Sequence, residues 1–333
     1  MRIAVYGAGA IGGWLGLELS RAGEDVTLIA RGPHLKAMQN HGVKVLIAGE
    51  ERVAHPRCVE SPADAGPQDY VFITLKAHSF VAVADQLAPL FEQHTAVVTG
   101  VNGIPWWYFH GLEGPWNNPT LESVDPGGKL WQAIGPERAI GCVVYPAAEL
   151  SAPGVIRHIE GDRFTLGEPD GNPSTRTQAL CDALNKAGFT SKVRDNLRDE
   201  IWLKLLGNLC FNPISALTLA TLDKVAGEPG TAAICRAMML EARQIGEKLG
   251  ARFRVSIDKR LAGGAAVGAH KTSMLQDLEL GRPMEIDALV TVVQELGRLV
   301  GVATPTIDIV LALIQQRGRS AGTYLASPAI PAA

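Results

Sequence analysis

The stretch IAVYGAGAIGG, residues 3–13, decides the fold of this chain. Its first four residues are apolar and predict a short buried strand. The residues that follow match the pattern G-x-G-x-x-G with Gly7, Gly9 and Gly12. In such a turn the first glycine permits a tight bend, the second lets the backbone approach a pyrophosphate, and the third lets helix and strand pack closely. The stretch therefore predicts a dinucleotide-binding strand–turn–helix.

The first two hundred residues around this stretch alternate short apolar runs with helical segments, which predicts a parallel sheet with helices on both faces. The expected strands are residues 3–6, 26–30, 70–75, 96–99, 139–145, 155–159, 163–167 and 191–194. The expected helices are residues 11–21, 34–40, 80–90 and 175–187. Residues 102–131 are rich in Trp, Gly and Pro, and we interpret them as a long loop or lid.

From about Asn196 the pattern changes to long helices. These are expected at residues 197–212, 231–249, 284–300 and 307–316. We therefore predict an α/β chain with a Rossmann-type, doubly wound domain over residues 1–194 and an all-helical domain over residues 195–333. The tail from residue 326 is rich in Ala and Pro and is expected to fray.

Composition is that of an ordinary globular protein and gives no sign of nucleic-acid or membrane binding. The 333 residues carry a net charge of −3, which gives no overall attraction to nucleic acid or anionic membranes. With no apolar run of about 18 residues and no basic leader, we expect a cytoplasmic protein without membrane segments. The five cysteines and eight histidines are scattered, so we expect neither a disulfide framework nor a metal site.

Arg31 indicates which dinucleotide is bound. The second expected strand ends at Ala30-Arg31-Gly32, where NAD-binding domains commonly carry Asp or Glu for the ribose hydroxyls. A cation here would instead pair with a 2′-phosphate. We therefore predict NADP(H), with its pyrophosphate at Ala10 and Ile11, where the first helix begins.

A polar stripe follows the helix expected at residues 197–212. Glu200, Lys204, Asn208 and Asn212 recur every four residues among apolar neighbours. At about 100° per residue they lie on one slowly turning face. The stripe favours a buried helix with one face toward a polar cleft. The alternative is a structural Glu–Lys pair with amides that cap the helix before Pro213.

A second polar segment covers residues 270–287. Gly281 and Pro283 interrupt the chain, and Glu285 follows in the first turn of the next expected helix. Because the helix dipole favours an acidic residue there, Glu285 has a structural interpretation as well as a catalytic one.

Taken together, these segments resemble the ketopantoate reductase family over nearly the whole chain. The matching motifs are the glycine turn, Arg31 to Leu35, Leu75-Lys76-Ala77, Asn102-Gly103-Ile104, Trp202 to Pro213, Ser273 to Asp277, and Glu285-Ile286-Asp287. The resemblance implies reduction of the small 2-oxo acid 2-dehydropantoate to pantoate with NADPH, a step toward pantothenate and coenzyme A. It also implies an active site in the cleft between the two domains.

The resemblance assigns roles to single residues. Lys204 is similar to the general acid, which bonds the keto oxygen and gives it a proton as hydride reaches the adjacent carbon. Glu285 would orient Lys204 and the substrate hydroxyl. By the same resemblance, Asn208 and Asn212 would position polar groups of the substrate, and Ser273 would bind its carboxylate. Lys76 and Asn102 would lie between the nicotinamide and the substrate.

The chain departs from the family pattern near the substrate. His270 stands where an asparagine that helps to hold substrate is expected, the loop at residues 218–223 lacks another asparagine, and residues 105–131 are longer than the family core. A reductase of a different 2-oxo acid therefore stays open. So does a non-catalytic NADP(H)-binding redox sensor, although an intact Lys204 and Glu285 argue against it. The apolar C-terminal helices are compatible with a homodimer.

Overall fold

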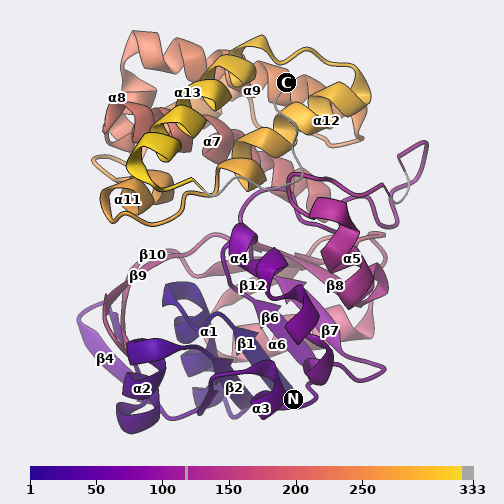
Figure 1. The fold of residues 1–333 in the computed structure, drawn as a ribbon, viewed down its shortest axis with the longest axis vertical. Helices are drawn as coiled ribbons and strands as arrows, with labels where there is room; N and C mark the ends of the chain where they lie inside the picture. The colour runs from indigo at the N-terminus through magenta and orange to yellow at the C-terminus, as the bar shows by residue number, and fades with distance from the viewer. Residues whose placement is uncertain (117–118, 325–333) are drawn as a thin grey trace. The chain divides into compact units, whose positions relative to one another are not determined.

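The computed structural model describes residues 1–116 and 119–324, and these form two compact units (Figure 1). The first unit comprises residues 1–101, 105–120 and 128–197. The second comprises residues 102–104, 121–127 and 198–333. The boundary between the long segments falls between Leu197 and Arg198, and two short segments of the N-terminal half cluster with the second unit.

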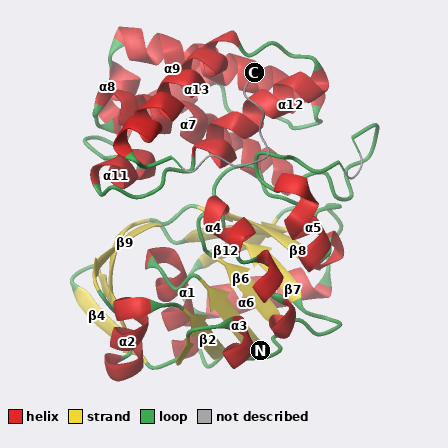
Figure 2. Ribbon diagram, viewed as in Figure 1, coloured by secondary structure: helices red, strands yellow, loops and turns green. Residues whose placement is uncertain are grey.

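The first unit contains an eight-stranded sheet with the order β12-β11-β8-β7-β6-β1-β2-β5 (Figure 2). Its strands are β1 (Arg2–Tyr6), β2 (Asp25–Ile29), β5 (Arg57–Val59), β6 (Tyr70–Ile73), β7 (Ala96–Thr99), β8 (Ala139–Val144), β11 (Arg163–Gly167) and β12 (Thr190–Val193). Neighbours run parallel except β8 and β11, which are antiparallel. The order places β1 between β2 and β6, which is the doubly wound arrangement that the sequence predicted.

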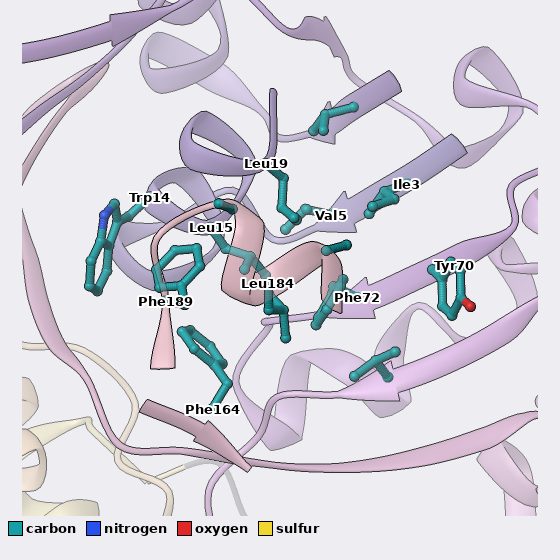
Figure 3. Close-up of a cluster of buried hydrophobic side chains, with 14 of the residues drawn as sticks. Ile3, Val5, Trp14, Leu15, Leu19, Tyr70, Phe72, Phe164, Leu184 and Phe189 are labelled. Atoms are coloured by element: carbon teal, nitrogen blue, oxygen red, sulfur yellow. The ribbon is translucent and has the colours of Figure 1, made fainter. Parts of the chain in front are cut away.

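One face of this sheet packs against α1 (Ala10–Arg21) and α6 (Thr175–Lys186). Figure 3 shows Ile3 and Val5 of β1 in one cluster with Leu15 and Leu19 of α1 and Leu184 of α6. All five side chains are fully buried. Burial of such side chains contributes about 1.5–3 kcal/mol each, so this cluster fixes the strand and helix that flank the glycine turn.

The structure adds a second, four-stranded sheet that the sequence did not predict, with the order β4-β3-β10-β9. Its strands are β3 (Val43–Ile47), β4 (Glu50–Ala54), β9 (Ala147–Ala152) and β10 (Val155–Glu160). Only the β10 segment was expected to be a strand. Its Ile156 side chain is fully buried and lies against Gly13, where an added Cβ would be 2.6 Å from Ile156 Cδ1. This sheet therefore covers part of α1.

The other helices of the first unit are short. They are α2 (Gly32–His41), α3 (Pro62–Ala65), α4 (Ala77–Ala82) and α5 (Lys129–Ile134). The helix expected at residues 80–90 was wrong as a single element, because α4 ends at Ala82 and two 3₁₀ turns follow, at Ala84–Gln86 and Ala88–Leu90. Pro89 explains why an α-helix does not continue to residue 90, since proline lacks an N–H group and its ring clashes with the carbonyl four residues earlier, but it lies too far along the chain to explain the end of α4 at Ala82.

The Trp-rich segment is a loop up to residue 125 where it is described, but a 3₁₀ turn at Pro126–Gly128 and the start of α5 were not predicted, and its first part is not a lid. Trp106, Trp107, Tyr108 and Phe109 are all at most 3% exposed and belong to the interior of the first unit. The Trp106 indole donates a hydrogen bond to the Thr99 hydroxyl at 3.3 Å. These aromatic side chains anchor the segment.

The second unit is helical throughout, which confirms the predicted fold class. Its helices are α7 (Leu197–Thr218), α8 (Leu222–Gly227), α9 (Pro229–Lys248), α10 (Ile257–Ala266), α11 (Ser273–Glu279), α12 (Val292–Val300) and α13 (Pro305–Ala321). The helix expected from residue 284 begins instead with a π-helical turn at Asp287–Thr291. Helix α7 continues through Pro213, past its expected end. The expected tail, residues 326–333, lies outside the described residues.

Within residues 1–116 and 119–324, no helix has the length and apolar character needed to cross a membrane.

Candidate active site

The glycine-rich turn lies between β1 and α1 of the first unit. Gly7 has φ +100°, in the left-handed region, and a Cβ there would lie 2.8 Å from the backbone nitrogen of Leu75. A Cβ on Gly12 would meet the Thr74 hydroxyl and would lie 2.5 Å from the Gly7 carbonyl oxygen. Glycine is therefore needed at position 7 for the bend and at position 12 for the contact between helix and turn.

Gly9 differs from these two glycines because the space beside it is open. A Cβ on Gly9 would meet only the Gly7 carbonyl oxygen, at 3.9 Å, among the described residues. Gly9 is also the N-cap of α1, and no side chain of the described chain caps this helix end. The N–H groups of Ala10 and Ile11, which open the helix, can therefore receive an anionic oxygen over Gly9. This surface fits a pyrophosphate.

Arg31 is exposed at the end of β2, where it forms the N-cap of α2. Burial raises the pKa of the Tyr6 phenol, and the positive charge of Arg31 acts in the opposite direction. The strand register pairs Tyr6 with Ile29, and the Gly7 N–H donates to the Ile29 carbonyl, so Arg31, two residues beyond Ile29, follows β2 beside the glycine turn. An exposed cation at this position suits an anionic group on the ribose of a dinucleotide.

His34 is a residue of this site that the sequence analysis missed. Its Nε2 atom lies 2.6 Å from the Ala8 carbonyl oxygen, and the backbone N–H of Gly154 donates to its Nδ1 atom at 2.9 Å. These partners assign the proton of the neutral ring to Nε2. His34 thus joins the glycine turn to the turn between β9 and β10. Only its place in the motif Arg31 to Leu35 drew attention to it.

Lys76 follows β6, the other neighbour of β1, and is the N-cap of α4. The segment before it is tied to the glycine turn, since the Thr74 hydroxyl donates to the Gly7 carbonyl at 2.8 Å and the Thr74 N–H donates to Tyr6 at 3.0 Å. The glycine turn, Arg31 and Lys76 therefore all lie at the carboxyl ends of adjacent parallel strands. Open α/β sheets bind ligands at such a position.

In the second unit, Asn102 lies between the two residues expected to be catalytic. The Lys204 ammonium donates to Asn102 Oδ1 at 2.7 Å, and Asn102 Nδ2 donates to Glu285 Oε2 at 3.4 Å. All three side chains are half-buried. Lys204 comes from α7, Glu285 precedes the π-helical turn, and Asn102 belongs to the short segment that clusters with the helical unit. The structure thus brings these three predicted residues together.

The backbone at Gly103 explains how Asn102 reaches this place. A Cβ on Gly103 would collide with the carbonyl oxygen of Ala288, in the π-helical turn, and Gly103 has φ +92°. Only glycine allows this approach. The Asp287 carboxylate of the same turn accepts hydrogen bonds from Thr291 at 2.7 Å and from Tyr324 at 2.9 Å. The turn that follows Glu285 is therefore anchored on both sides.

The remaining predicted substrate residues lie on or after α7. Asn212 is 5% exposed, and its Nδ2 atom donates to the Ser273 hydroxyl at 3.4 Å. Asn208 is half-buried one turn beyond Lys204. His270 is held through its backbone, which donates to Gly268 at 2.7 Å and accepts from Leu222 at 2.8 Å. The structure therefore joins Asn212 to Ser273 and places His270 in the loop before α11.

The chemistry available is that of an ammonium group held beside an amide and a carboxylate. Such a group can bond a carbonyl oxygen and give it a proton. No group of three His, Cys, Asp or Glu residues within the described part of the chain is arranged to hold a metal ion.

Comparison with known proteins identifies the relatives of this chain. Residues 3–106 match the family model described as ketopantoate reductase PanE/ApbA, and residues 196–318 match the model for its C-terminal part. A 2-dehydropantoate 2-reductase from Mesorhizobium japonicum is 56% identical over 325 residues, which is 97% of this chain and 100% of that protein.

Solved structures agree. A protein from Ralstonia solanacearum MolK2 superposes with a TM-score of 0.93 at 40% identity, covering 97% of this chain and 99% of that one. The 2-dehydropantoate 2-reductase from Geobacter metallireducens GS-15 superposes with a TM-score of 0.83 at 28% identity, covering 95% and 99%. A D-mandelate dehydrogenase solved with NADH shares the fold, with a TM-score of 0.82 at 20% identity over 97% of this chain and all of that one.

Proposed function

The chain belongs to the ketopantoate reductase family, and from that premise we propose that it reduces 2-dehydropantoate to pantoate with NADPH. The observation that carries the proposal is the group formed by Lys204, Asn102 and Glu285. An ammonium 2.7 Å from an amide oxygen, with a carboxylate on the same amide, is a positioned proton donor.

Lys204 acts as the general acid in the proposed reaction. NADPH, when bound, would supply a hydride to the keto carbon of the substrate and would leave as NADP⁺. Lys204 bonds the keto oxygen and transfers a proton to it as negative charge develops there. The product is an alcohol, and Lys204 is left as a neutral amine that regains a proton from water. Asn102 holds the ammonium through its amide oxygen, and Glu285 fixes the orientation of that amide.

The other predicted residues supply binding. Asn208, Asn212, Ser273 and His270 line the proposed substrate site along α7 and before α11. On the cofactor side, Gly7, Gly9, Gly12, Ala10 and Ile11 hold the pyrophosphate, and Lys76 borders the nicotinamide. We propose NADP(H) in particular because Arg31 stands where NAD-specific domains commonly carry an acid.

We also propose a cytoplasmic location and a homodimer. Ile309 and Leu313 lie one turn apart on α13 and are 63% and 54% exposed, so pairing of two copies could bury them. Light scattering on the purified protein tests the assembly, and a monomeric mass at micromolar concentration contradicts it.

The deciding experiment is the initial rate of NADPH oxidation with 2-dehydropantoate, measured beside a panel of other 2-oxo acids. We expect selective turnover of 2-dehydropantoate. Faster turnover of another acid would support the second candidate, a reductase of a different 2-oxo acid, which the His270 departure favours. NADPH binding without any turnover would support the redox sensor.

Lys204→Ala tests the mechanism. We expect kcat to fall by about 10²- to 10⁴-fold because the proton donor is lost, while NADPH affinity stays unchanged. The exposed Lys224 of α8 provides the control, since Lys224→Ala removes a cation from the same unit without touching the site. Near-normal turnover by Lys204→Ala contradicts the mechanism.

A further inference from the structure

Arg260 lies against α7 on the face that carries Lys204. An added Cβ on Gly207 would be in collision with Arg260 Nη2, 3.1 Å from Cζ and 3.3 Å from Nε. Three atoms of the guanidinium group are thus the nearest neighbours of this glycine. Gly207 is buried in the middle of α7, so the charged end of Arg260 reaches the helix backbone itself.

Helix geometry places this contact beside the proposed proton donor. At about 100° per residue, Gly207 projects roughly 60° from Lys204 and roughly 20° from Glu200. One helical turn along the axis, about 5 Å, separates Lys204 from Gly207. Residues three apart on a helix are surface neighbours, so the guanidinium lies beside Lys204, on the side of the stripe that carries Glu200 and about 100° from Asn208.

The position of Arg260 is built into the packing of α10 on α7. One turn beyond Gly207, Phe211 contacts Gly264, where an added Cβ would lie 2.6 Å from the ring atom Cζ. Gly264 stands one turn beyond Arg260 on α10. Helices α7 and α10 thus touch at two points one helical turn apart, and each contact has a glycine on one of the two helices. The Nε atom of Arg260 is fully buried.

Gly207 is a costly residue for a helix interior, because glycine is the least favourable residue there after proline. Its use is explained by the contact, since any side chain would displace the guanidinium. The group that Arg260 binds best is a carboxylate, which the planar guanidinium can engage through two parallel hydrogen bonds.

We propose that Arg260 is a specificity-determining residue that binds the carboxylate of the 2-oxo acid while Lys204 bonds the adjacent keto oxygen. The inference rests on the proposed reduction of a 2-oxo acid and extends it. Ser273 can offer the same carboxylate a neutral hydroxyl, whereas Arg260 supplies the compensating charge. The site would then select anionic 2-oxo acids over their neutral esters.

The test compares Arg260→Ala with the native enzyme on the fastest acid of the panel and on the methyl ester of that acid. We expect the KM for the acid to rise about 10- to 100-fold, with kcat changed less than about threefold, and the KM for the ester to stay unchanged. Lys259→Ala is the matched control, because it removes an exposed cation from the neighbouring position of α10.

Gly207→Ala gives a second, independent readout. Alanine favours the helix but displaces the guanidinium, so the KM for the acid should rise while the fold is retained. In the Arg260→Ala background, Gly207→Ala should have no further effect on this KM, since the group it displaces is already gone. Additive effects of the two substitutions, or an equal loss on acid and ester, overturn the proposal.

Failure of the proposed reaction is distinguishable from failure of this inference. If another acid is reduced in place of 2-dehydropantoate, the same comparison is made on that acid. If no acid is reduced, calorimetric titration of the NADP-bound protein with pyruvate and with methyl pyruvate replaces the kinetics. Carboxylate binding that Arg260→Ala abolishes then supports the site without the reaction, and carboxylate binding that is absent or independent of Arg260 overturns it.

Discussion

Arg31 and His34 are three residues apart, and their proposed contributions to cofactor binding differ. Arg31 is exposed and offers charge, whereas His34 links the Ala8 carbonyl to the Gly154 N–H. The first role can be predicted from sequence because one residue type at the end of β2 indicates the ribose partner. The second cannot, since both partners of His34 are backbone atoms that any residue would supply.

Replacing Arg31 by Ala should remove the preference for NADPH. We expect the KM for NADPH to rise about 10- to 100-fold and the KM for NADH to stay within about twofold, because only NADPH carries the 2′-phosphate that Arg31 is proposed to bind. Steady-state kinetics with both cofactors provide the measurement. Lys36→Ala, at an exposed position of α2, is the control. An unchanged ratio of the two KM values would refute the role of Arg31.

Replacing His34 by Ala should weaken both cofactors alike. The substitution removes the hydrogen bonds to the Ala8 carbonyl and from the Gly154 N–H, so the surface proposed for the pyrophosphate loses its support. We expect a rise of about 3- to 30-fold in Kd for NADPH and for NADH, measured by quenching of protein fluorescence. His34→Gln keeps one hydrogen-bond donor and one acceptor, so its Kd values should lie between those of the native protein and of His34→Ala. Selective loss of NADPH would contradict the structural role.

At the scale of elements, prediction succeeded where the hydrophobic pattern was unambiguous. Strands β1, β6 and β7 are fully or nearly fully buried, so each is a short apolar run bounded by polar residues or glycine. Strand β4 reads EERVA and buries only its last residue, so its sequence carries no such signal. It is held by pairing with β3, a contact between segments that local pattern does not reveal.

The start of α6 depends on a buried carboxylate. Glu168 is 7% exposed and accepts hydrogen bonds from Arg176 at 2.6 and 2.9 Å, and from the hydroxyls of Ser174 and Thr177 at 2.5 Å. Burial alone would raise the pKa of Glu168, but the hydrogen bonds, led by those from Arg176, outweigh it and lower the pKa. The charged form is therefore favoured in the folded protein.

The pKa of Glu168 is lower in the folded protein than in the unfolded chain, where it is about 4.3. Ionised Glu168 therefore stabilises the fold above about pH 4.3, and this stabilisation is lost as the pH falls through the folded-state pKa. We expect Glu168→Gln to lower Tm by a few degrees at pH 7, and the difference from the native protein to shrink below about pH 4. Thermal unfolding across this pH range is the measurement. The exposed Glu160 supplies the control through Glu160→Gln. A Tm difference that does not vary with pH would contradict the role.

At the scale of the whole molecule, the two units are not continuous stretches of the sequence. Residues 102–104 and 121–127 come from the N-terminal half but cluster with the helical unit. The sequence predicted a single change of pattern near residue 195, because hydrophobic periodicity reports elements and not which unit they join. Asn102 shows the functional consequence, since its bond to Lys204 depends on this exchange.

Glu295 fixes one of the two exchanged segments. Its carboxylate accepts the backbone N–H of Glu122 at 2.8 Å, the N–H of Ser123 at 2.9 Å and the Ser123 hydroxyl. A chain that crosses repeatedly between its units should unfold as one, so we expect a single calorimetric transition for the native protein. NADPH at about 100 times its Kd should stabilise that whole transition by about 2.7 kcal/mol, although the proposed cofactor residues lie mainly in the first unit.

Glu295→Ala should loosen this coupling. Without the carboxylate, two backbone N–H groups lose their partner, at a cost of about 1–3 kcal/mol each if they stay buried. We expect the single transition to split into two. NADPH should not shift the transition at lower temperature, but should shift the one at higher temperature. Glu247→Ala, which removes an exposed carboxylate from α9, should leave one transition. Two transitions already present in the native protein, with only one responding to NADPH, would show that residues 121–127 do not couple the units.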